Sequence, residues 1–285
     1  MSGILGIIGG SGLYEMKSLK NVRQMTIRTP FGLPSDALVV GELEGKRVAF
    51  LPRHGRGHRI SPSDINYRAN IYAMKKIGAD AVLSVSAVGS MKEKIRPGDI
   101  VIVDQFFDHT KRRISTFFSD GVVAHVSMAD PVCPVLSKVV YEAARGVAKR
   151  VHRGGTYLCM EGPTFSTRAE SEIYRKWGID VIGMTNMPEA KLAREAELCY
   201  AVMALATDYD CWHKQEEDVA VEAVIEILRR NVENSKEIIC KTARHFPLPG
   251  GCMCGEALKN TIITDHKKIS AAARKRLSFL MGKYL

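Results

Sequence analysis

Short apolar runs alternate with amphipathic segments along most of this chain of 285 residues. Runs rich in Val, Ile and Ala that are bounded by Gly, Pro or polar residues predict buried strands, and apolar residues spaced three and four apart predict helices. A first strand is predicted within residues 1–10, where it runs into a glycine turn, and further strands at 37–41, 47–51, 81–85, 100–103, 180–183 and 198–206. Helices are predicted at 65–77, 136–151, 169–177, 188–196 and 219–242.

The order of these elements predicts the fold class. Strands that alternate with helices indicate an α/β protein with helices on both faces of a sheet. The two short strands at 37–41 and 47–51 follow each other directly, which predicts a mixed, partly antiparallel sheet. Thr167 and Glu170 form a capping-box pattern before the helix at 169–177, and Gly178 suits its exit.

One domain is expected for residues 1–246. The run of Pro and Gly at 247–251 sets off a C-terminal extension, 247–285, which is expected to be part of the same domain. Hydrophobic residues make up 46% of the chain and charged residues 25%, as in ordinary globular proteins. No apolar stretch approaches the roughly 20 residues of a membrane span, and the first ten residues lack a basic leader, so the expected location is the cytoplasm.

The net charge of +10 is concentrated near the end of the chain. Residues 241–285 carry nine Lys/Arg against two Asp/Glu. No basic and aromatic platform of the kind that stacks nucleic-acid bases accompanies them. The basic residues of the predicted last helix therefore indicate a solvated or subunit-facing surface: Lys267, Lys268, Arg274, Lys275 and Arg276. The positive balance also favours a small anionic substrate.

Seven cysteines are scattered along the chain. An odd number without a signal peptide indicates mostly reduced thiols. Cys252 and Cys254 stand in a Pro/Gly-rich segment without the second pair that a zinc site needs, so no metal is expected there. A disulfide between them and a pair of reduced thiols remain open alternatives.

Two acidic residues follow the apolar run at 200–206. Asp208 and Asp210 are two positions apart, so their side chains can face the same way on a strand. Burying two acids at the end of a strand is costly, so such a pair is not expected in a core without a function. The alternative is that the two acids belong to an exposed acidic turn. Adenine suits the functional alternative, because its amine donates to a carboxylate and its N7 accepts a proton from a carboxylic acid.

Three other strand ends carry groups that suit an anion. Gly9, Gly10 and Ser11 fit neither the dinucleotide fingerprint nor the P-loop, but a glycine turn with a hydroxyl offers donors to a small anion. The segment 53–58 supplies arginines and histidines with no acidic residue before Asp64, and Ser84 and Ser86 end another buried run. A solvated basic loop and tightly packed serines are the corresponding alternatives.

An apolar stripe at helical spacing follows the acidic pair: Val221, Val224, Ile225 and Leu228. Such a stripe is typical of a core-facing helix. If this helix also covers the site, the stripe would offer a water-poor pocket to an apolar substituent.

Seven motifs in order, between about residues 3 and 245, resemble the methylthioadenosine phosphorylases of the trimeric purine nucleoside phosphorylase group. They are 7–13 (IIGGSGL), 29–32 (TPFG), 53–56 (RHGR), 66–70 (NYRAN), 161–165 (EGPTF), 183–189 (GMTNMPE) and 206–210 (ATDYD). The resemblance implies a nucleoside phosphorylase-like α/β fold and phosphorolysis of 5′-methylthioadenosine to adenine and 5-methylthioribose 1-phosphate. It also implies a homotrimer or a hexamer of two trimers, a role in purine and methionine salvage, and no metal or organic cofactor.

The resemblance also implies site residues, position by position. The implied phosphate set is Ser11, Arg53, His54, Ser86, Ala87 and Thr185. The implied nucleoside set is Phe165, Ser166, Met184, Thr207, Asp208, Asp210, Val221, Val224, Ile225 and, from a neighbouring subunit, His125. Ser11 stands where many members have Thr, which keeps the hydroxyl.

A mechanism follows for the two acids. Burial and the like charge of Asp210 are both expected to raise the pKa of Asp208, so that it holds a proton for N7. Carboxylate acceptors disfavour purines with an oxygen at position 6. A phosphorylase for adenosine, 6-oxopurine nucleosides or methylthioinosine is the alternative, followed by a nucleosidase that uses water and a silent purine-binding protein.

Overall fold

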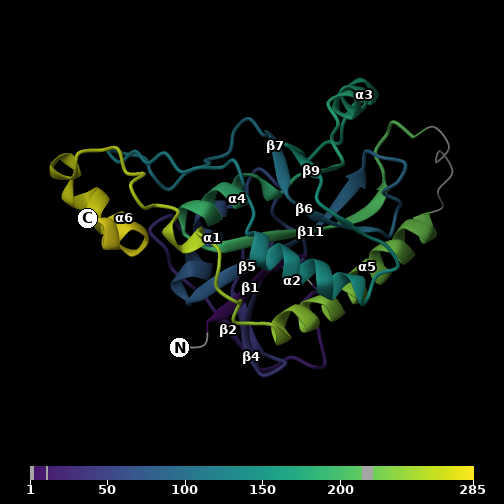
Figure 1. Cartoon of the computed structure of the whole chain (residues 1–285), viewed down its shortest axis with the longest axis horizontal. Coiled ribbons are helices and arrows are strands. Elements are labelled where there is room, and N and C mark those ends of the chain that lie inside the picture. Colours follow the sequence, from purple (N-terminus) through teal and green to yellow (C-terminus); the bar gives the residue numbers. More distant parts are fainter. Residues whose placement is uncertain (1–2, 11, 214–220) are drawn as a thin grey trace.

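The computed structural model describes residues 3–10, 12–213 and 221–285. Their strands form one mixed sheet with helices on both faces (Figure 1), which confirms the predicted fold class. The strands are β1 (Ile4–Gly9), β2 (Lys20–Met25), β3 (Leu38–Leu43), β4 (Lys46–Pro52), β5 (Ala79–Ser90), β6 (Ile100–Val103), β7 (Gln105–His109), β8 (Val151–Arg153), β9 (Thr156–Met160), β10 (Val181–Gly183) and β11 (Cys199–Tyr209). The α-helices are α1 (Tyr67–Lys76), α2 (Pro134–Arg145), α3 (Arg168–Lys176), α4 (Asn186–Glu195), α5 (Val221–Arg244) and α6 (Ala271–Met281).

The sheet mixes parallel and antiparallel pairs, and its outer parallel pairs are β9–β10, β7–β9 and β6–β8. Its main path is β2-β3-β4-β1-β5-β10-β9-β7, while β11 pairs with β5 and β6, and β6 with β8. Strand β1 runs parallel to β4 and β5, and β11 runs parallel to β5. The pairs β3–β4, β2–β3, β6–β11 and β10–β5 are antiparallel. The expected mixed sheet with an antiparallel start is therefore confirmed.

Four of the described strands are absent from the prediction, and three of them lack a strong apolar pattern, whereas the fourth, β9, is largely buried. Strand β2 is exposed over most of its length and lies at an edge of the sheet. Strands β7 and β8 are likewise partly exposed. A half-solvated edge strand carries little hydrophobic periodicity, so its pairing partner rather than its own sequence determines it.

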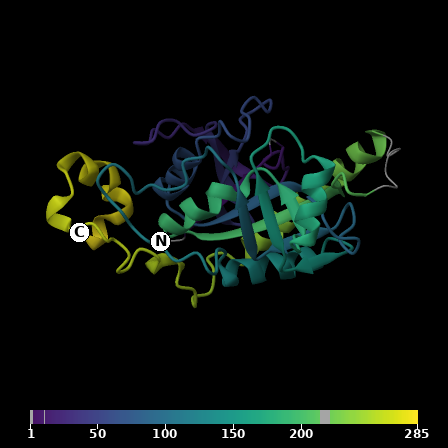
Figure 2. The same ribbon diagram turned by 90° about the horizontal axis from the view of Figure 1, so that it is seen from above.

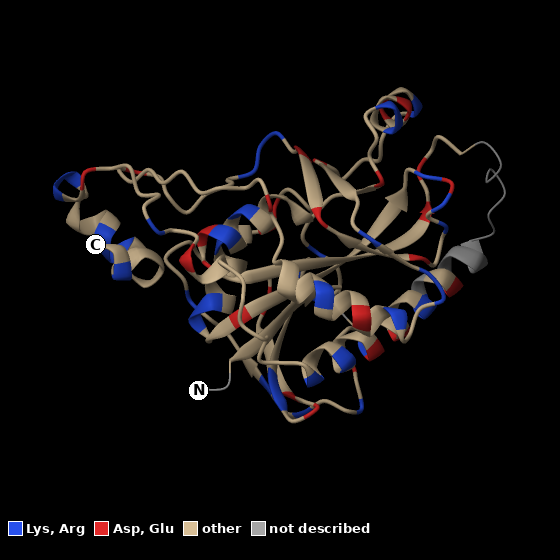
Figure 3. Ribbon diagram, in the orientation of Figure 1, with Lys and Arg blue, Asp and Glu red and all other residues tan. Residues whose placement is uncertain are grey.

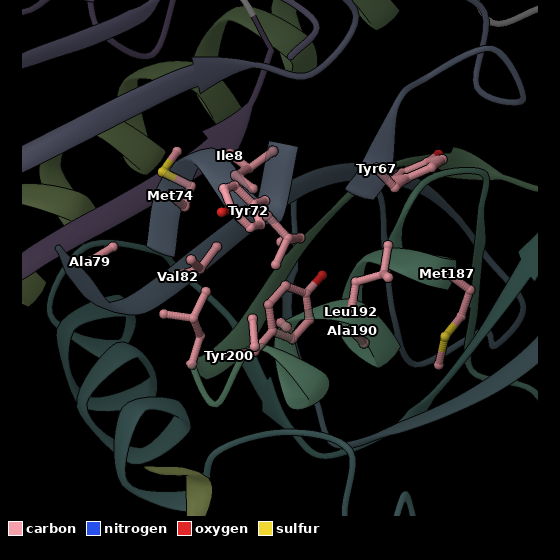
Figure 4. Close-up of a cluster of buried hydrophobic side chains, with 14 of the residues drawn as sticks. Ile8, Tyr67, Tyr72, Met74, Ala79, Val82, Met187, Ala190, Leu192 and Tyr200 are labelled. Carbon is pink, nitrogen blue, oxygen red and sulfur yellow. The ribbon is translucent and has the colours of Figure 1, made fainter. Parts of the chain in front are cut away.

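Side chains alternate between two buried clusters, one on each face of the sheet. On β1, Ile4 and Ile8 belong to the first cluster, and Leu5 and Ile7 to the second. Helices α1 and α4 pack on the first face and α2 and α5 on the second. Figure 4 shows part of the first cluster, with Ile8 of β1, Tyr72 of α1, Tyr200 of β11 and residues of α4 among the labelled side chains.

Two local predictions have different outcomes. The capping box at the start of α3 is present in both directions, between Thr167 and Glu170. The helix predicted at 136–151 is too long, because α2 ends at Arg145 and Val151 begins β8. Gly146 caps α2, and glycine is a frequent helix terminator.

The C-terminal residues lie at one end of the molecule (Figures 1 and 2). Leu258, Ile269 and Leu277 join the same buried cluster as α1, and the rings of Tyr72 and Phe279 are 5.4 Å apart. The basic residues of this end are coloured blue on the ribbon of Figure 3; Lys267, Lys268 and Lys275 are exposed, whereas Arg276 pairs with Asp120 at 3.1 Å. Among the described residues, no helix combines the length and apolar character needed to cross a membrane.

Candidate active site

A cavity of about 440 Å³ lies at the carboxyl ends of the central strands. Ligands of open α/β sheets bind at this edge, and the volume is that of a small-molecule site. Ten of the residues that the sequence analysis expects in a site line it together: Arg53, His54, Ser86, Ala87, Phe165, Met184, Thr185, Thr207, Asp208 and Asp210.

A fork in the sheet creates one end of this cavity. Along one edge of β5, pairing with β1 ends at Ser84, and pairing with β10 begins at Gly89. Residues 85–88 lie between these two partners, and all four line the cavity. Because strand backbones carry hydrogen-bonding groups that need partners, this gap offers main-chain groups to a ligand beside the hydroxyl of Ser86.

The guanidinium of Arg53 is buried behind this fork. Its Nε donates to Glu189 Oε2 at 2.9 Å, and its Nη2 donates to Glu189 Oε1 at 3.1 Å. Further bonds run to the carbonyl of Val85 at 3.0 Å and to the Ser84 hydroxyl at 2.5 Å. Burial lowers the pKa of Arg53, but the charge of Glu189 and the hydrogen bonds to it together outweigh this and raise the pKa overall. Of the five N–H groups, the second on Nη1 has no acceptor among the described residues.

Two hydroxyls stand next to each other at the fork. The Oγ of Ser86 and Oγ1 of Thr185 are 3.3 Å apart, and both side chains are buried. The hydroxyl of Tyr157 lies 3.3 Å from Ser86 Oγ and accepts from the backbone N–H of Thr185 at 3.5 Å. Because a hydroxyl both donates and accepts, this pair can turn its protons toward an anion.

His54 is a neutral group rather than a cation. Burial lowers its pKa to about 4, and the neighbouring charge of Arg53 also lowers it. Its Nδ1 lies 2.9 Å from the carbonyl oxygen of Ile60, which can only accept, so Nδ1 carries the proton and Nε2 a lone pair. The basic segment 53–58 also has an acidic partner, because Arg56 pairs with Asp36 at 2.7 Å. Asp36 lies 20 residues before Arg56, so the local sequence does not indicate this pair.

The two acids line the same cavity beside the end of β5. The pairing of β11 with β5 has an irregularity between Ala206 and Asp208, after which Asp208 pairs with Gly89. A Cβ atom on Gly89 would lie 3.6 Å from Asp208 Oδ2 and 3.6 Å from the Cβ of Asp210. Asp210 is 9% exposed, and the Thr207 hydroxyl donates to Asp208 Oδ1. Both side chains therefore flank one glycine at the strand end.

Apolar side chains also line the cavity. Met160, Ile182 and Met184 contribute to it, and Phe165 borders it although 83% of that side chain is exposed in the single chain. Such a lining suits a ring or an alkyl group.

Several expected residues stand elsewhere. Ser166 does not line the cavity; its hydroxyl donates to Met160 Sδ at 3.8 Å, and Met160 does line it. His125 lines two other cavities, of about 840 Å³ and 470 Å³, and its expected approach from a neighbouring subunit stays a prediction. Ser11 lies outside the described residues, as do the side chains of Val221, Val224, Ile225 and Leu228, whose backbones belong to α5.

The sequence analysis misses residues that support the site. Glu189 is fully buried against Arg53, although the motif 183–189 contains it. A buried arginine needs an acidic partner, and the predicted buried strand at 47–51, which Arg53 closely follows, is a signal for such a partner. Tyr157 lies on β9, which carries no prediction, and Asn231 lines the cavity from α5.

Comparison with known proteins gives one consistent result. The model of the phosphorylase superfamily matches residues 4–244. An S-methyl-5′-thioadenosine phosphorylase of Geobacter sulfurreducens is 57% identical over 286 residues and covers 100% of both chains. One from Gloeobacter violaceus is 53% identical and covers 98% of this chain and 95% of its own.

Solved structures agree in fold. A methylthioadenosine phosphorylase sourced from an Antarctic soil metagenomic library superposes with a TM-score of 0.94 at 49% identity, covering 98% of this chain and 99% of that one. The methylthioadenosine phosphorylase of Schistosoma mansoni in complex with adenine has a TM-score of 0.79 at 40% identity, covering 85% and 91%. These findings confirm the family resemblance read from the motifs. The chain therefore belongs to the phosphorylase superfamily and, within it, to the S-methyl-5′-thioadenosine phosphorylases.

Proposed function

We propose that this protein catalyses the reversible phosphorolysis of S-methyl-5′-thioadenosine to adenine and 5-methylthio-α-D-ribose 1-phosphate. The observation that carries the proposal is the composition of one cavity, which is lined both by groups that suit an anion and by two acids. Relatives at 57% and 53% identity carry the name of this enzyme. Inorganic phosphate is the co-substrate, and the reaction itself needs no organic cofactor.

Phosphate binds at the fork between β1 and β10. The hydroxyls of Ser86 and Thr185, main-chain groups around Ala87 and the remaining N–H of Arg53 hold its oxygens. Glu189 neutralises Arg53 in part, so the site does not depend on one unbalanced charge. The neutral His54 accepts a hydrogen bond from a hydroxyl of the bound phosphate through Nε2, and Ser11 adds a hydroxyl from the glycine turn.

The nucleoside occupies the rest of the cavity. Met184 lies under the ribose, and Phe165 packs on the base with Ser166 behind it. Asp208 gives a proton to N7 of adenine, and Asp210 accepts from the N6 amine, with Thr207 orienting Asp208. The 5′-methylthio group lies toward Val221, Val224 and Ile225 and toward His125 of a second copy of the chain.

The bond changes balance across the cavity. The C1′–N9 bond breaks and its electron pair leaves with adenine, which takes the proton of Asp208 at N7. A phosphate oxygen forms a new bond to C1′ as positive charge develops on the ribose. Stabilising both charges at once is worth more in the transition state than in the bound substrate. Asp208 recovers its proton in the reverse reaction or from water.

The assembly and the location follow the same proposal. A trimer, or a hexamer of two trimers, would bring His125 to a neighbouring active site, and the cytoplasm is the proposed compartment. The ligands are small molecules rather than nucleic acid or membrane lipid.

A product assay tests the function. Adenine release from methylthioadenosine and adenosine, and hypoxanthine release from inosine, are followed with and without phosphate. We expect adenine release from methylthioadenosine that requires phosphate, weaker turnover of adenosine, and little of inosine. Turnover without phosphate identifies a nucleosidase, preferred turnover of inosine identifies a 6-oxopurine enzyme, and binding without turnover identifies a silent purine-binding protein.

A further inference from the structure

Four cysteines from distant parts of the chain meet at one place. They are Cys133, Cys199, Cys252 and Cys254, whose sulfur atoms all lie within 4.8 Å of one another. Cys133 is the N-cap of α2, Cys199 begins β11, and the other two belong to the segment that leads to the short helix at Cys254–Glu256. All four are free thiols.

The spacing of the sulfurs suits a metal ion better than disulfides. Tetrahedral zinc binds thiolates at about 2.3 Å, which places the sulfurs about 3.8 Å apart. The Sγ atoms of Cys199 and Cys252 are 3.4 Å apart, whereas a disulfide requires about 2.05 Å. We propose that the four thiolates bind one Zn²⁺ ion in a closed, structural tetrathiolate site.

The surroundings of the cluster support thiolate charge. The N–H of Leu136 donates to Cys133 Sγ at 3.5 Å at the N-terminus of α2, where the helix dipole favours an anion. Arg194 Nη1 donates to Cys254 Sγ at 3.9 Å. Four thiolates around Zn²⁺ carry a net charge of −2, which the Arg194 guanidinium offsets in part. Such donors to the ligating sulfurs are the outer contacts expected of a metal centre.

Burial indicates a structural rather than a catalytic ion. Cys133 and Cys254 are 1% and 3% exposed, and Cys199 and Cys252 are partly buried. With four protein ligands, the ion has no open position for a substrate. None of the four cysteines lines the cavity of the candidate active site. The ion would tie the segment at 252–254, and the extension that follows it, to α2 and β11.

The cluster supplies the second cysteine pair that is missing near Cys252 and Cys254 in the sequence. Cys133 and Cys199, which lie 119 and 53 residues before Cys252, join them in the fold. The spacing of the cysteines along the chain does not predict such a site, because only the fold brings the two pairs together.

Metal analysis of the full-length protein tests the proposal. The protein is purified with a reductant, dialysed against metal-free buffer and measured by plasma mass spectrometry. We expect about one zinc per chain, and seven titratable thiols after denaturation with a chelator and no reductant. Replacement of zinc by Co²⁺ should give the thiolate charge-transfer and d–d bands of a tetrahedral tetrathiolate, and this readout needs no mutant.

Paired variants locate the ion. Cys252→Ser combined with Cys254→Ser should lose the zinc and make the region after residue 247 more sensitive to protease, whereas Cys240→Ser, which lies outside the cluster, should keep it. The proposal is overturned by protein that stays free of zinc after reconstitution or by three or five titratable thiols, which reveal disulfides. One iron per chain, or zinc retained in the double variant, overturns it equally. Because none of these readouts is turnover, they are independent of the proposed phosphorolysis.

Discussion

Arg53 and Glu189 form a two-pronged ion pair in the interior, with side chains only 3% and 0% exposed. The Oε1 of Glu189 also accepts from Ser84 at 2.7 Å and from the Tyr200 hydroxyl at 2.9 Å. The pair therefore joins β4, β5, β11 and α4 directly behind the fork of the sheet. In the proposed function, Arg53 therefore stabilises the structure around the phosphate as well as offering it an N–H group.

Glu189→Gln should be strongly destabilising. The substitution leaves the Arg53 charge buried without its partner, which typically costs about 3–5 kcal/mol. Urea unfolding measures this as a fall in the free energy of unfolding. Glu233→Gln is the control, because Glu233 is 70% exposed in its pair with Lys236 and should change stability by less than about 1 kcal/mol. A similar small effect at Glu189 would contradict a structural role for the pair.

Ser86→Ala tests phosphate binding more cleanly than any change at Arg53. Arg53→Ala would leave Glu189 unpaired and disturb the fold, so its kinetics would mix two effects. Removing the Ser86 hydroxyl should raise the KM for phosphate about 10-fold, as expected for one lost hydrogen bond to an ion of about 1.5 kcal/mol. The KM for nucleoside at saturating phosphate should stay near the wild-type value. A change in the nucleoside KM alone would move Ser86 to the other substrate.

The sequence predicts the elements that are buried and periodic. The strands predicted at 81–85, 100–103 and 198–206 are confirmed. Each has a continuous apolar run, which is typical of a strand covered on both faces. The regular part of α4 begins at Pro188, as predicted, because Met187 is not helical. Exposed strands such as β2 depend on a partner far along the chain and leave little local signal.

The cavity is also predictable in part, because its lining residues follow buried apolar runs. Strand ends of a parallel sheet meet at one edge, so polar residues after apolar runs, such as Ser86 and Asp208, come together. The sequence does not reveal which side chains and which strands, distant along the chain, pair with each other around the cavity. Glu189 lies 136 residues from Arg53, and only the register of β1, β5 and β10 creates the gap in which a ligand fits.

Asp208→Asn should lower turnover of methylthioadenosine and adenosine, since an amide has no acidic proton for N7. A positioned general acid is worth roughly 10²–10⁴-fold in rate. The amide can also donate to O6, so we expect a relative gain for inosine. The control is Asp80→Asn, an exposed acid at the opposite end of β5. If kinetics on all three nucleosides stay unchanged, Asp208 takes no part in the mechanism.

Gly183→Ala should damage the site through Tyr157. A Cβ on Gly183 would lie 2.0 Å from the Tyr157 hydroxyl and 2.6 Å from its ring, and both are part of a packed core. Overpacking of this kind costs about 1–3 kcal/mol, and the displaced Tyr157 would shift Ser86 and Thr185. We expect lower thermal stability together with a raised KM for phosphate. Gly250→Ala, where a Cβ meets nothing within 4 Å, should change neither property.

His54 predicts a specific dependence of stability on pH. Burial lowers its pKa to about 4 in the folded chain, from 6.5 as the ordinary value. Between these pH values the unfolded chain binds a proton that the folded chain does not, so this contribution to stability is complete above pH 6.5 and is lost as the pH falls toward 4.

The variant His54→Asn has no such proton to bind. We measure the free energy of unfolding of both proteins in urea at several pH values. The value for the variant minus that for the wild type should rise as the pH falls from 6.5 to 4, and it should stay constant above pH 6.5. His245→Asn, at an exposed position, is the control for the chemical change. The kcat/KM for phosphate of the wild type should show no ionisation of His54 between pH 5 and 8, because its ring is neutral throughout that range. A difference that instead grows above pH 6.5 would mean that the folded protein holds His54 protonated, and that its Nε2 donates to the phosphate instead of accepting from it.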